Sequence, residues 1–213
     1  MRRYLISTIL LGGHRNNCIC PCCGAWDRER WLYYVLQNKT DISQMSGRIL
    51  HFAPEKGIIN YIKKNERIDY YTADIVSGRA MHVTDITDIQ YREGTFDYVI
   101  SNHVLEHIVD EKKAVNEIKR VLKKNGKWIF SFPICTDITT YEDPAIVSYE
   151  ARLAAYGQSD HVRLYGYDYK TRFEKYGFEL QVFSPEKEID TICIKKYGFI
   201  KDDVIIVATK MSK

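Results

Sequence analysis

The chain has 213 residues, 45% of them hydrophobic, and its 31 Lys and Arg residues nearly balance 28 Asp and Glu residues, which leaves a formal net charge of +3. A chain of this length and composition can bury one sizeable core, so we expect one main domain. The even charge balance does not favour nucleic acid as a partner, because binding through phosphates needs a clustered basic face.

The N-terminus, MRRYLISTILLGG, combines two arginines with a short apolar run. The run is too short to span a bilayer, and no small-residue cleavage site follows it cleanly, as a secretory signal would require. We therefore expect a peripheral helix or strand of the domain here, and a soluble cytoplasmic protein with no membrane partner.

Four cysteines crowd into the segment CICPCCG, at Cys18, Cys20, Cys22 and Cys23. A structural zinc site usually pairs two C-x₂-C units that lie well apart in the sequence. This segment resembles the second half of a zinc ribbon whose first half is absent. Zinc is therefore not favoured as a cofactor, and we expect reduced structural cysteines.

From residue 47 onward, short apolar runs alternate with helical patterns. The expected strands cover residues 48–52, 68–73, 80–83, 96–101, 128–132, 178–183 and 204–209. The expected helices cover residues 55–65, 110–123 and 167–176, and the second of them stops at Asn125-Gly126. Residues 134–166 form a long polar loop, which is typical of a functional or a disordered segment, and residues 184–203 are charged and mixed. The alternation predicts an α/β fold with a parallel sheet covered on both faces.

Polar residues follow each of the first four expected strands, at 51–55, 74, 85 and 102–107. Ligands of a parallel sheet bind at the carboxyl ends of its strands, near the switch in strand order. Asp74 follows Glu55 by 19 residues, a distance at which an acid can accept hydrogen bonds from a ribose diol. These positions are therefore the first candidates for a ligand site.

The stretch FDYVISNHVLEHI, the helix after it and the stretch RVLKKNGKWIFSFP resemble the class I S-adenosylmethionine-dependent methyltransferases. In that family an FD-type fourth strand leads into a polar segment ending in Leu-Glu-His, and a helix ending in RVLK-x-x-G leads into the fifth strand. The resemblance extends over residues 45–183. More narrowly, LHFAPE at 50–55 is similar to the first motif of a bacterial subgroup. The segments DIT at 85–87, TYED at 140–143, GQSDHVRLYGYDY at 157–169 and CPCCGAWDRER at 20–30 point to the same subgroup.

The resemblance implies a doubly wound, mostly parallel seven-stranded sheet with helices on both faces, a Rossmann-like methyltransferase fold. Its antiparallel seventh strand would be residues 204–209, inserted beside the fifth strand. Residues 45–213 would form the S-adenosylmethionine-binding methyltransferase domain. Residues 1–44 would be an N-terminal segment that carries the cysteine cluster and packs on the main domain.

The resemblance also implies which residues bind the cofactor, S-adenosylmethionine. The residues implied are His51, Phe52, Ala53, Pro54 and Glu55 under the methionine part, Asp74 at the ribose hydroxyls, Asp85 and Ile86 around the adenine, and Asn102 and His103 near the sulfonium or carboxylate. The chain departs from the usual family pattern at His51, Ala53 and Glu55, where a strand-terminal acid and glycines are expected. Ala53 is still small enough for close backbone approach, and the cofactor's amino group is the natural partner of Glu55.

Methyl transfer from a sulfonium needs positioning and, for a hydroxyl acceptor, a base. The candidate catalytic residues are His107, Asp160 and His161, because a histidine titrates near neutrality and Asp160 could assist it. Structural roles remain open: Glu106-His107 as a pair that pins the turn, and His161 with Arg163 as a pair that orders the loop. Equally open are the roles of four polar residues, as the lining of a sugar-like acceptor site or as partners of the loop itself: Tyr141, Glu142, Tyr165 and Asp168.

The expected function is O-methylation of a small acceptor, such as a saccharide or its nucleotide-linked precursor. A nicotinamide-dependent dehydrogenase is disfavoured, because no G-x-G-x-x-G follows the first strand. The alternative is a non-catalytic cofactor-fold or zinc-knob module that binds RNA or a protein partner, and a third reading is a domain that has lost the cofactor. Neither the acceptor nor the oligomeric state can be read from these residues.

Overall fold

A computed structural model describes residues 18–211, so the expectation for MRRYLISTILLGG lies outside the described residues. The strands are β1 (Gly47–Phe52), β2 (Ile68–Asp74), β3 (His82–Val83), β4 (Phe96–Asn102), β5 (Leu122–Ser131), β6 (Ile134–Cys135), β7 (Tyr165–Gly166), β8 (Phe178–Phe183) and β9 (Ile205–Lys210). The helices are α2 (Asp27–Asn38), α3 (Lys56–Ile62), the 3₁₀ turn η1 (Leu105–His107), α4 (Glu111–Val121), α5 (Tyr149–Tyr156), α6 (Tyr169–Glu174), α7 (Pro185–Glu188) and α8 (Thr191–Tyr197).

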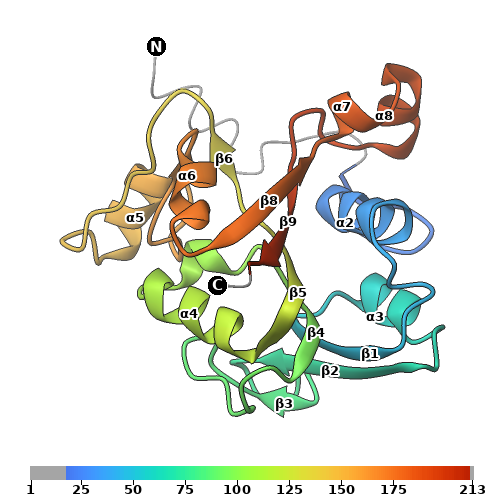
Figure 1. The fold of residues 1–213 in the computed structure, drawn as a ribbon. Helices are drawn as coiled ribbons and strands as arrows, with labels where there is room; N and C mark the ends of the chain where they lie inside the picture. Colours follow the sequence, from blue (N-terminus) through green and yellow to red (C-terminus); the bar gives the residue numbers. More distant parts are fainter. Residues whose placement is uncertain (1–17, 212–213) are drawn as a thin grey trace.

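Seven strands form one sheet in the order β3-β2-β1-β4-β5-β9-β8 (Figure 1). The pairs from β3 to β5 are parallel, and β9 lies antiparallel between β5 and β8. The predicted fold is confirmed, including the antiparallel strand beside the fifth. Strand order reverses between β1 and β4, and this switch point is where a doubly wound sheet binds its ligand.

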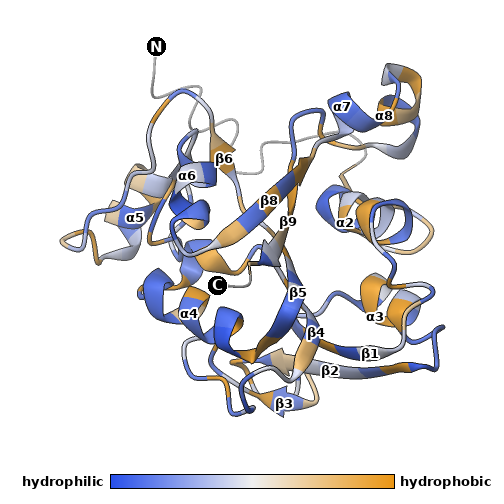
Figure 2. Cartoon of the chain, in the orientation of Figure 1, coloured by the Kyte–Doolittle hydropathy of each residue, from blue (hydrophilic) through white to orange (hydrophobic). Residues whose placement is uncertain are grey.

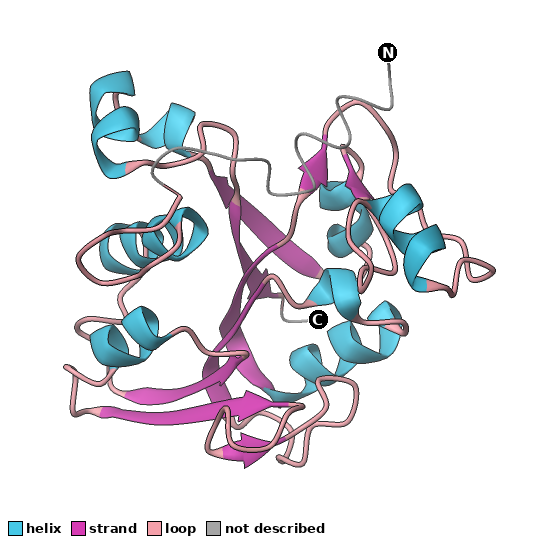
Figure 3. Ribbon diagram, turned by 180° about the vertical axis from the view of Figure 1, so that it is seen from behind, coloured by secondary structure: helices cyan, strands magenta, loops and turns pink. Residues whose placement is uncertain are grey.

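Helices cover both faces of the sheet, as the view from behind also shows (Figure 3). On one face, α4 and α6 bury apolar side chains such as Ile118 and Phe173 against the strands. On the other face, α2 and α3 bury Leu32 and Ile58 in a second cluster. In Figure 2 the helices α2, α3 and α4 each carry hydrophobic and hydrophilic stretches, as expected for helices that lie with one side on a sheet.

The helix α2 is an element that the sequence patterns did not single out. Its side chains Trp31, Leu32, Val35 and Leu36 are fully buried, in one cluster with residues of β1 and β4. Trp31 also donates a hydrogen bond from Nε1 to the carbonyl of Phe183 at 3.4 Å. Residues ahead of the first strand therefore supply part of the cover on one face of the sheet.

The boundary between α4 and β5 differs from the expectation that the helix runs to Asn125-Gly126. The helix ends at Val121, and Leu122 already pairs with Phe96 of β4. The register then shifts before Lys127 pairs with Tyr98, and Asn125 takes a left-handed φ of 60° within this irregular stretch. Burial of Leu122 in the sheet core starts the strand early, so the Asn-Gly pair turns the chain inside the strand instead of capping the helix.

The two segments expected to be irregular contain short elements. Residues 134–166 carry β6, α5 and β7, and residues 184–203 carry α7 and α8. The strands β6 and β7 pair with each other in a small parallel sheet of their own. Among the residues that the structure describes, the helices are all too short or too polar to cross a lipid bilayer.

We predict that Trp31→Ala lowers the free energy of unfolding by about 3–5 kcal/mol, the usual cost of removing a large buried aromatic side chain. The measurement is chemical denaturation of the full chain, with Gln37→Ala on the exposed side of the same helix as the control. A change below about 1 kcal/mol for Trp31→Ala would mean that α2 is not part of the cooperative core.

Candidate functional site

The register of the sheet brings the carboxyl ends of the central strands to one edge. Phe52 at the end of β1 lies beside Ala73 of β2 and Ser101 of β4, and Asn102 lies beside Ser131 of β5. The loops that follow these strands therefore open on the same side of the sheet. We call this region the strand-end edge, defined by residues 53–55, 74, 85 and 103.

The loop after β1 turns without a glycine because Ala53 takes a left-handed conformation, with φ of 46°. Its amide donates to the carbonyl of Ala73 at 2.9 Å, which fixes the turn against β2. His103, after β4, is also left-handed, with φ of 53°. Such backbone costs about 1–2 kcal/mol for a residue with a Cβ and is concentrated at functional sites. The exposed methyl group of Ala53 still lets a ligand approach closely.

Glu55 connects the loop after β1 to the end of β4. Its Oε1 accepts a hydrogen bond from Asn102 Nδ2 at 2.7 Å, and its Oε2 lies 3.1 Å from His51 Nε2. His51 Nδ1 is 2.7 Å from the Tyr70 hydroxyl, and the Ser131 hydroxyl donates to Asn102 Oδ1. A polar chain therefore joins four neighbouring strands beneath the strand-end edge.

The charge of Glu55 is favoured by its partners in this chain. Burial acts to raise the pKa of Glu55, but the hydrogen bond and charge of His51 and the hydrogen bond from Asn102 outweigh burial. The pKa of Glu55 consequently lies below its ordinary value. A carboxylate that is only 13% exposed is thus kept anionic at the edge where a cation could meet it.

Asp74 and Asp85 lie close together because β2 and β3 pair at their ends. Asp74 is opposite Val83, and the Thr84 amide donates to the Asp74 carbonyl at 3.0 Å. Each aspartate uses one carboxylate oxygen to hold its own loop, Asp74 with the amide of Val76 and Asp85 with the amide of Thr87, both at 2.8 Å. Within residues 18–211, these amides are the hydrogen-bond donors to the two carboxylates, and each donates to Oδ1.

Several predicted cofactor residues lie beneath the edge instead of on it. His51, Phe52, Ile86 and Asn102 are between 0% and 4% exposed. Their side chains support the loops, with Phe52 and Ile86 in the apolar core and His51 and Asn102 in the polar chain. Pro54 is half-buried in the turn.

The three predicted catalytic residues are brought together beside the end of β4. His107 Nδ1 lies 3.3 Å from Asp160 Oδ2, and the rings of His107 and His161 have centroids 4.8 Å apart and planes at 83°. His161 is 2% exposed, and burial lowers the pKa of its imidazole. The neutral form of His161, which can accept a proton or donate a lone pair, is therefore favoured.

Glu106 belongs to this cluster, although the sequence analysis gave it only a role in the turn. It is 1% exposed, and its Oε1 lies 3.0 Å from His103 Nδ1. Burial acts to raise the pKa of Glu106, but the hydrogen bond and charge of His103 and the charge of His107 outweigh it, so the pKa lies below its ordinary value. The sequence signal for this role was the stretch HVLEH at residues 103–107, because it places the side chains of His103, Glu106 and His107 within one tight turn.

Arg163 fixes the segment after residue 157 to the turn after β4. Its guanidinium, which is 3% exposed, donates to the carbonyls of Leu105, Ile108 and Val109 and to Glu142. Arg172 bridges Glu142 to Glu111, at 2.8 and 2.7 Å. These contacts support the loop-ordering role that the sequence left open for Arg163.

The residues considered as a sugar-like lining are largely engaged within the loop. Tyr165 is fully buried and donates to Glu111 at 2.6 Å, and Asp168 accepts from the amide and hydroxyl of Thr140, both at 2.7 Å. Tyr141, by contrast, is 43% exposed. The polar side chains of this segment therefore serve mainly to hold it in place.

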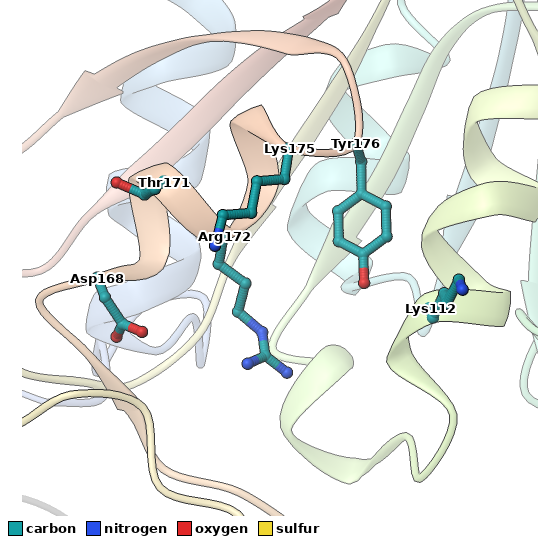
Figure 4. A pocket seen from close by; sticks show the side chains of 6 residues that line it. All are labelled: Lys112, Asp168, Thr171, Arg172, Lys175 and Tyr176. Atoms are coloured by element: carbon teal, nitrogen blue, oxygen red, sulfur yellow. The ribbon is translucent and has the colours of Figure 1, made fainter.

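A cavity of about 400 Å³ between α4 and α6 lies apart from the strand-end edge (Figure 4). Its lining consists of Lys112, Asp168, Thr171, Arg172, Lys175 and Tyr176. Arg172 is already committed to Glu111 and Glu142, and none of the predicted cofactor or catalytic residues lines this cavity. We therefore place the candidate site at the strand-end edge and the histidine cluster.

Comparison with known proteins finds a domain match over the central part of the chain. Residues 42–130 match the family described as a methyltransferase domain, and this range spans β1 to β5 with the strand-end edge. An uncharacterized protein of Methanocaldococcus jannaschii is 47% identical over 45 residues, a stretch that spans 21% of this chain and only a fifth of that protein's length.

Solved structures share the fold at low identity. A Haemonchus contortus phosphoethanolamine N-methyltransferase in complex with S-adenosyl-L-methionine matches with a TM-score of 0.57 and 16% identity, over 98% of this chain and 56% of that one. A Listeria monocytogenes protein provisionally described as an S-adenosylmethionine-dependent methyltransferase matches with a TM-score of 0.57 and 17% identity, over 87% of this chain and 98% of that one.

The match to the methyltransferase-domain family covers residues 42–130, and the seven-stranded sheet has the same fold as these solved structures. Outside the matched range, β8 and β9 complete the sheet.

We predict that Glu55→Gln loses stability relative to the unchanged chain at neutral pH, and that this difference shrinks as the pH falls. Because the folded pKa of Glu55 is lowered, its charge stabilises the fold fully above the unfolded-state value near 4.5, and this contribution is lost as the pH falls through the lower folded pKa. Urea denaturation of both chains at several pH values measures the difference. A difference in unfolding free energy that stays constant until the protein unfolds in acid would contradict the lowered pKa of Glu55.

Proposed function

We propose that this protein is an S-adenosylmethionine-dependent methyltransferase that binds its cofactor at the strand-end edge and transfers the methyl group to a hydroxyl of a small acceptor, such as a saccharide or its nucleotide-linked precursor. The observation that carries the proposal is the convergence of the Ala53 turn, Asp74, Asp85 and the end of β4 on one side of the sheet. The alternative of a non-catalytic binding module is not favoured, because it leaves this arrangement without a role.

The described residues fit the proposed cofactor at four points. Asp74 has a carboxylate oxygen available for the ribose hydroxyls, and Asp85 is exposed near it, where the adenine amine would need an acceptor. Glu55 offers a negative charge to the ammonium group of the methionine part. The left-handed turn at Ala53 brings backbone, with only a methyl group, against the same region.

The acceptor would be bound on the side of His107, Asp160 and His161. In the proposed transfer, an acceptor oxygen forms a bond to the methyl carbon while the carbon–sulfur bond breaks, and the sulfur leaves as neutral S-adenosylhomocysteine. The hydroxyl proton passes to the histidine cluster. His161 is suited to this because burial favours its neutral form.

The subgroup resemblance at LHFAPE supports a bacterial enzyme of saccharide metabolism, and the polar 134–166 segment provides a surface beside the cluster where such an acceptor could be recognised. Tyr141 is an exposed aromatic residue of that segment, and an aromatic face of this kind is suited to stacking on a sugar ring. We propose the saccharide as the acceptor on these grounds, and a cytoplasmic location follows from the same reading.

We predict that the full chain binds S-adenosylmethionine and S-adenosylhomocysteine in calorimetric titrations, and that Asp74→Asn weakens both about ten- to a hundredfold. Loss of hydrogen bonds to a charged acceptor costs about 1.5–3 kcal/mol, which corresponds to that range. The matched control is Asp69→Asn, an exposed aspartate earlier on the same strand, which should leave both affinities unchanged. Absence of binding by the unchanged chain would refute the cofactor proposal.

We predict that methyl-labelled S-adenosylmethionine transfers label to saccharides or nucleotide-linked sugars as an alkali-stable ether. With the acceptor found in such a panel, His161→Asn should lower the turnover number about 10²- to 10⁴-fold, the usual contribution of an acid–base group. Its affinity for S-adenosylmethionine serves as the control for intact folding. Label found only on an amine, or in an ester that alkali releases, would exclude the hydroxyl acceptor.

A further inference from the structure

We propose that Glu106, His107 and His161 form a binding site for a divalent transition-metal ion of the zinc class. Each residue offers one ligand atom, and these atoms all lie within 4.8 Å of one another. Protein ligands sit about 2 Å from a zinc ion, so two ligands of one ion are up to about 4 Å apart. Small side-chain rotations would therefore close the three atoms onto a common ion. The proposal goes beyond methyl transfer, because metal binding does not depend on it.

The first supporting observation is an unsatisfied oxygen in the cluster. Glu106 is 1% exposed, and among the described residues its Oε2 has no hydrogen-bond partner. A buried carboxylate oxygen without a partner costs free energy unless something else binds it. Its other oxygen, Oε1, is occupied by His103 Nδ1 at 3.0 Å. The oxygen without a partner, Glu106 Oε2, therefore belongs to a side chain that lies beside the imidazoles of His107 and His161.

The second observation is the support behind the proposed ligands. His107 Nδ1 faces Asp160 Oδ2 at 3.3 Å, which leaves Nε2 as the nitrogen available to a metal. Metal-binding histidines almost always direct their other nitrogen to a carboxylate, a carbonyl or water, which fixes the ring and raises its basicity. His103 supports Glu106 in the same way through Oε1. Two of the three proposed ligands thus have a partner that orients them.

The frame around the cluster is rigid, although its ligands are far apart in the sequence. The Val162 amide donates to the Glu106 carbonyl at 2.8 Å, directly beside His161. Arg163 adds bonds from its guanidinium to the carbonyls of Leu105 and Ile108, on either side of Glu106 and His107. The two segments are therefore joined by backbone and side-chain bonds on both sides of the cluster, so that binding requires little reordering.

The donor set selects the class of metal. Two imidazole nitrogens and one carboxylate oxygen suit zinc and its neighbours in the first transition series, whereas magnesium and calcium prefer oxygen ligands alone. Three protein ligands leave a tetrahedral ion one open position, as in catalytic zinc sites. In the proposed methyltransferase, an acceptor hydroxyl bound at that position would lose its proton more readily. With the ion bound, His107 and His161 would serve as ligands, and the proton would pass to solvent instead of to His161.

The four cysteines at residues 18–23 are a second place where a divalent metal could bind, so the experiment must separate the two. The probe is Co²⁺, titrated into the reduced full chain and followed by absorption. Bound at the proposed site, Co²⁺ gives visible d–d bands without the near-ultraviolet charge-transfer band that thiolate ligands produce. We expect one equivalent with this signature, retained when Cys20 and Cys23 are both replaced by Ser.

The ligand variants complete the test. His161→Ala and His107→Ala should each abolish the Co²⁺ signal, and Asp160→Asn should weaken binding about ten- to a hundredfold, as expected for a residue that orients a ligand. His107 is partly exposed, with 35% of its side chain accessible, so its replacement should leave the fold intact even if that of His161 does not. Circular dichroism of each variant checks this.

The proposal is overturned if the unchanged chain binds no Co²⁺, if the signal persists in His107→Ala, or if the Cys20 and Cys23 replacements remove it. Excess Mg²⁺ should not displace Co²⁺. Displacement of Co²⁺ by an equal concentration of Mg²⁺ would contradict the proposal that imidazole nitrogens bind the ion. Asp74→Asn should leave the Co²⁺ spectrum unchanged while it lowers the affinity for S-adenosylmethionine. Failure of the metal site and failure of the cofactor proposal can therefore be told apart.

Discussion

The hydrogen bond between Glu55 and Asn102 joins the loop that follows β1 to the end of β4, and the sheet reverses its order between these two strands. A parallel sheet leaves a crevice at this point, because the chains leave the two strands toward opposite faces. The bond ties the two sides of the crevice together at the level where a ligand would lie. The orientation of the Ala53 turn and of the residues after Asn102 depends on it.

This bond also links the two parts of the candidate site. Asn102 ends β4, His103 follows in a left-handed conformation, and Glu106 then turns inward to meet His103. Five residues thus connect the polar chain beneath the strand-end edge with the histidine cluster. Because both lie on one short segment, a displacement of the end of β4 would move the cofactor side and the acceptor side together.

The sheet could be predicted from the sequence because its strands are dictated by local patterns. The apolar run FDYVIS and the acids at Asp74 and Asp85 gave both the strands and the edge on which they end. The helix α2 was not among the predicted elements, although its apolar residues Trp31, Leu32, Val35 and Leu36 recur at helical spacing.

The end of α4 shows a different limit. Asn125-Gly126 is a sound signal for the end of a helix, yet the pairing of Leu122 with Phe96 of β4 overrides it. A contact between residues so far apart in sequence is invisible to any local pattern. The same holds for Glu106, whose isolation from water and approach to His161 result from Arg163 binding the carbonyls on both sides of it.

The glutamate of LHFAPE stands where a glycine-rich loop is usual, and the structure gives a physical reason. Two tasks that glycines perform are divided here between neighbours: Ala53 accepts the left-handed turn, and Glu55 anchors the loop to β4. Such an anchor requires that the carboxylate of Glu55 stays charged although it is largely buried. His51, which lies inside the sheet and contacts the Tyr70 hydroxyl, favours this charge. The buried histidine is therefore the part that allows a carboxylate to stand in the loop after β1.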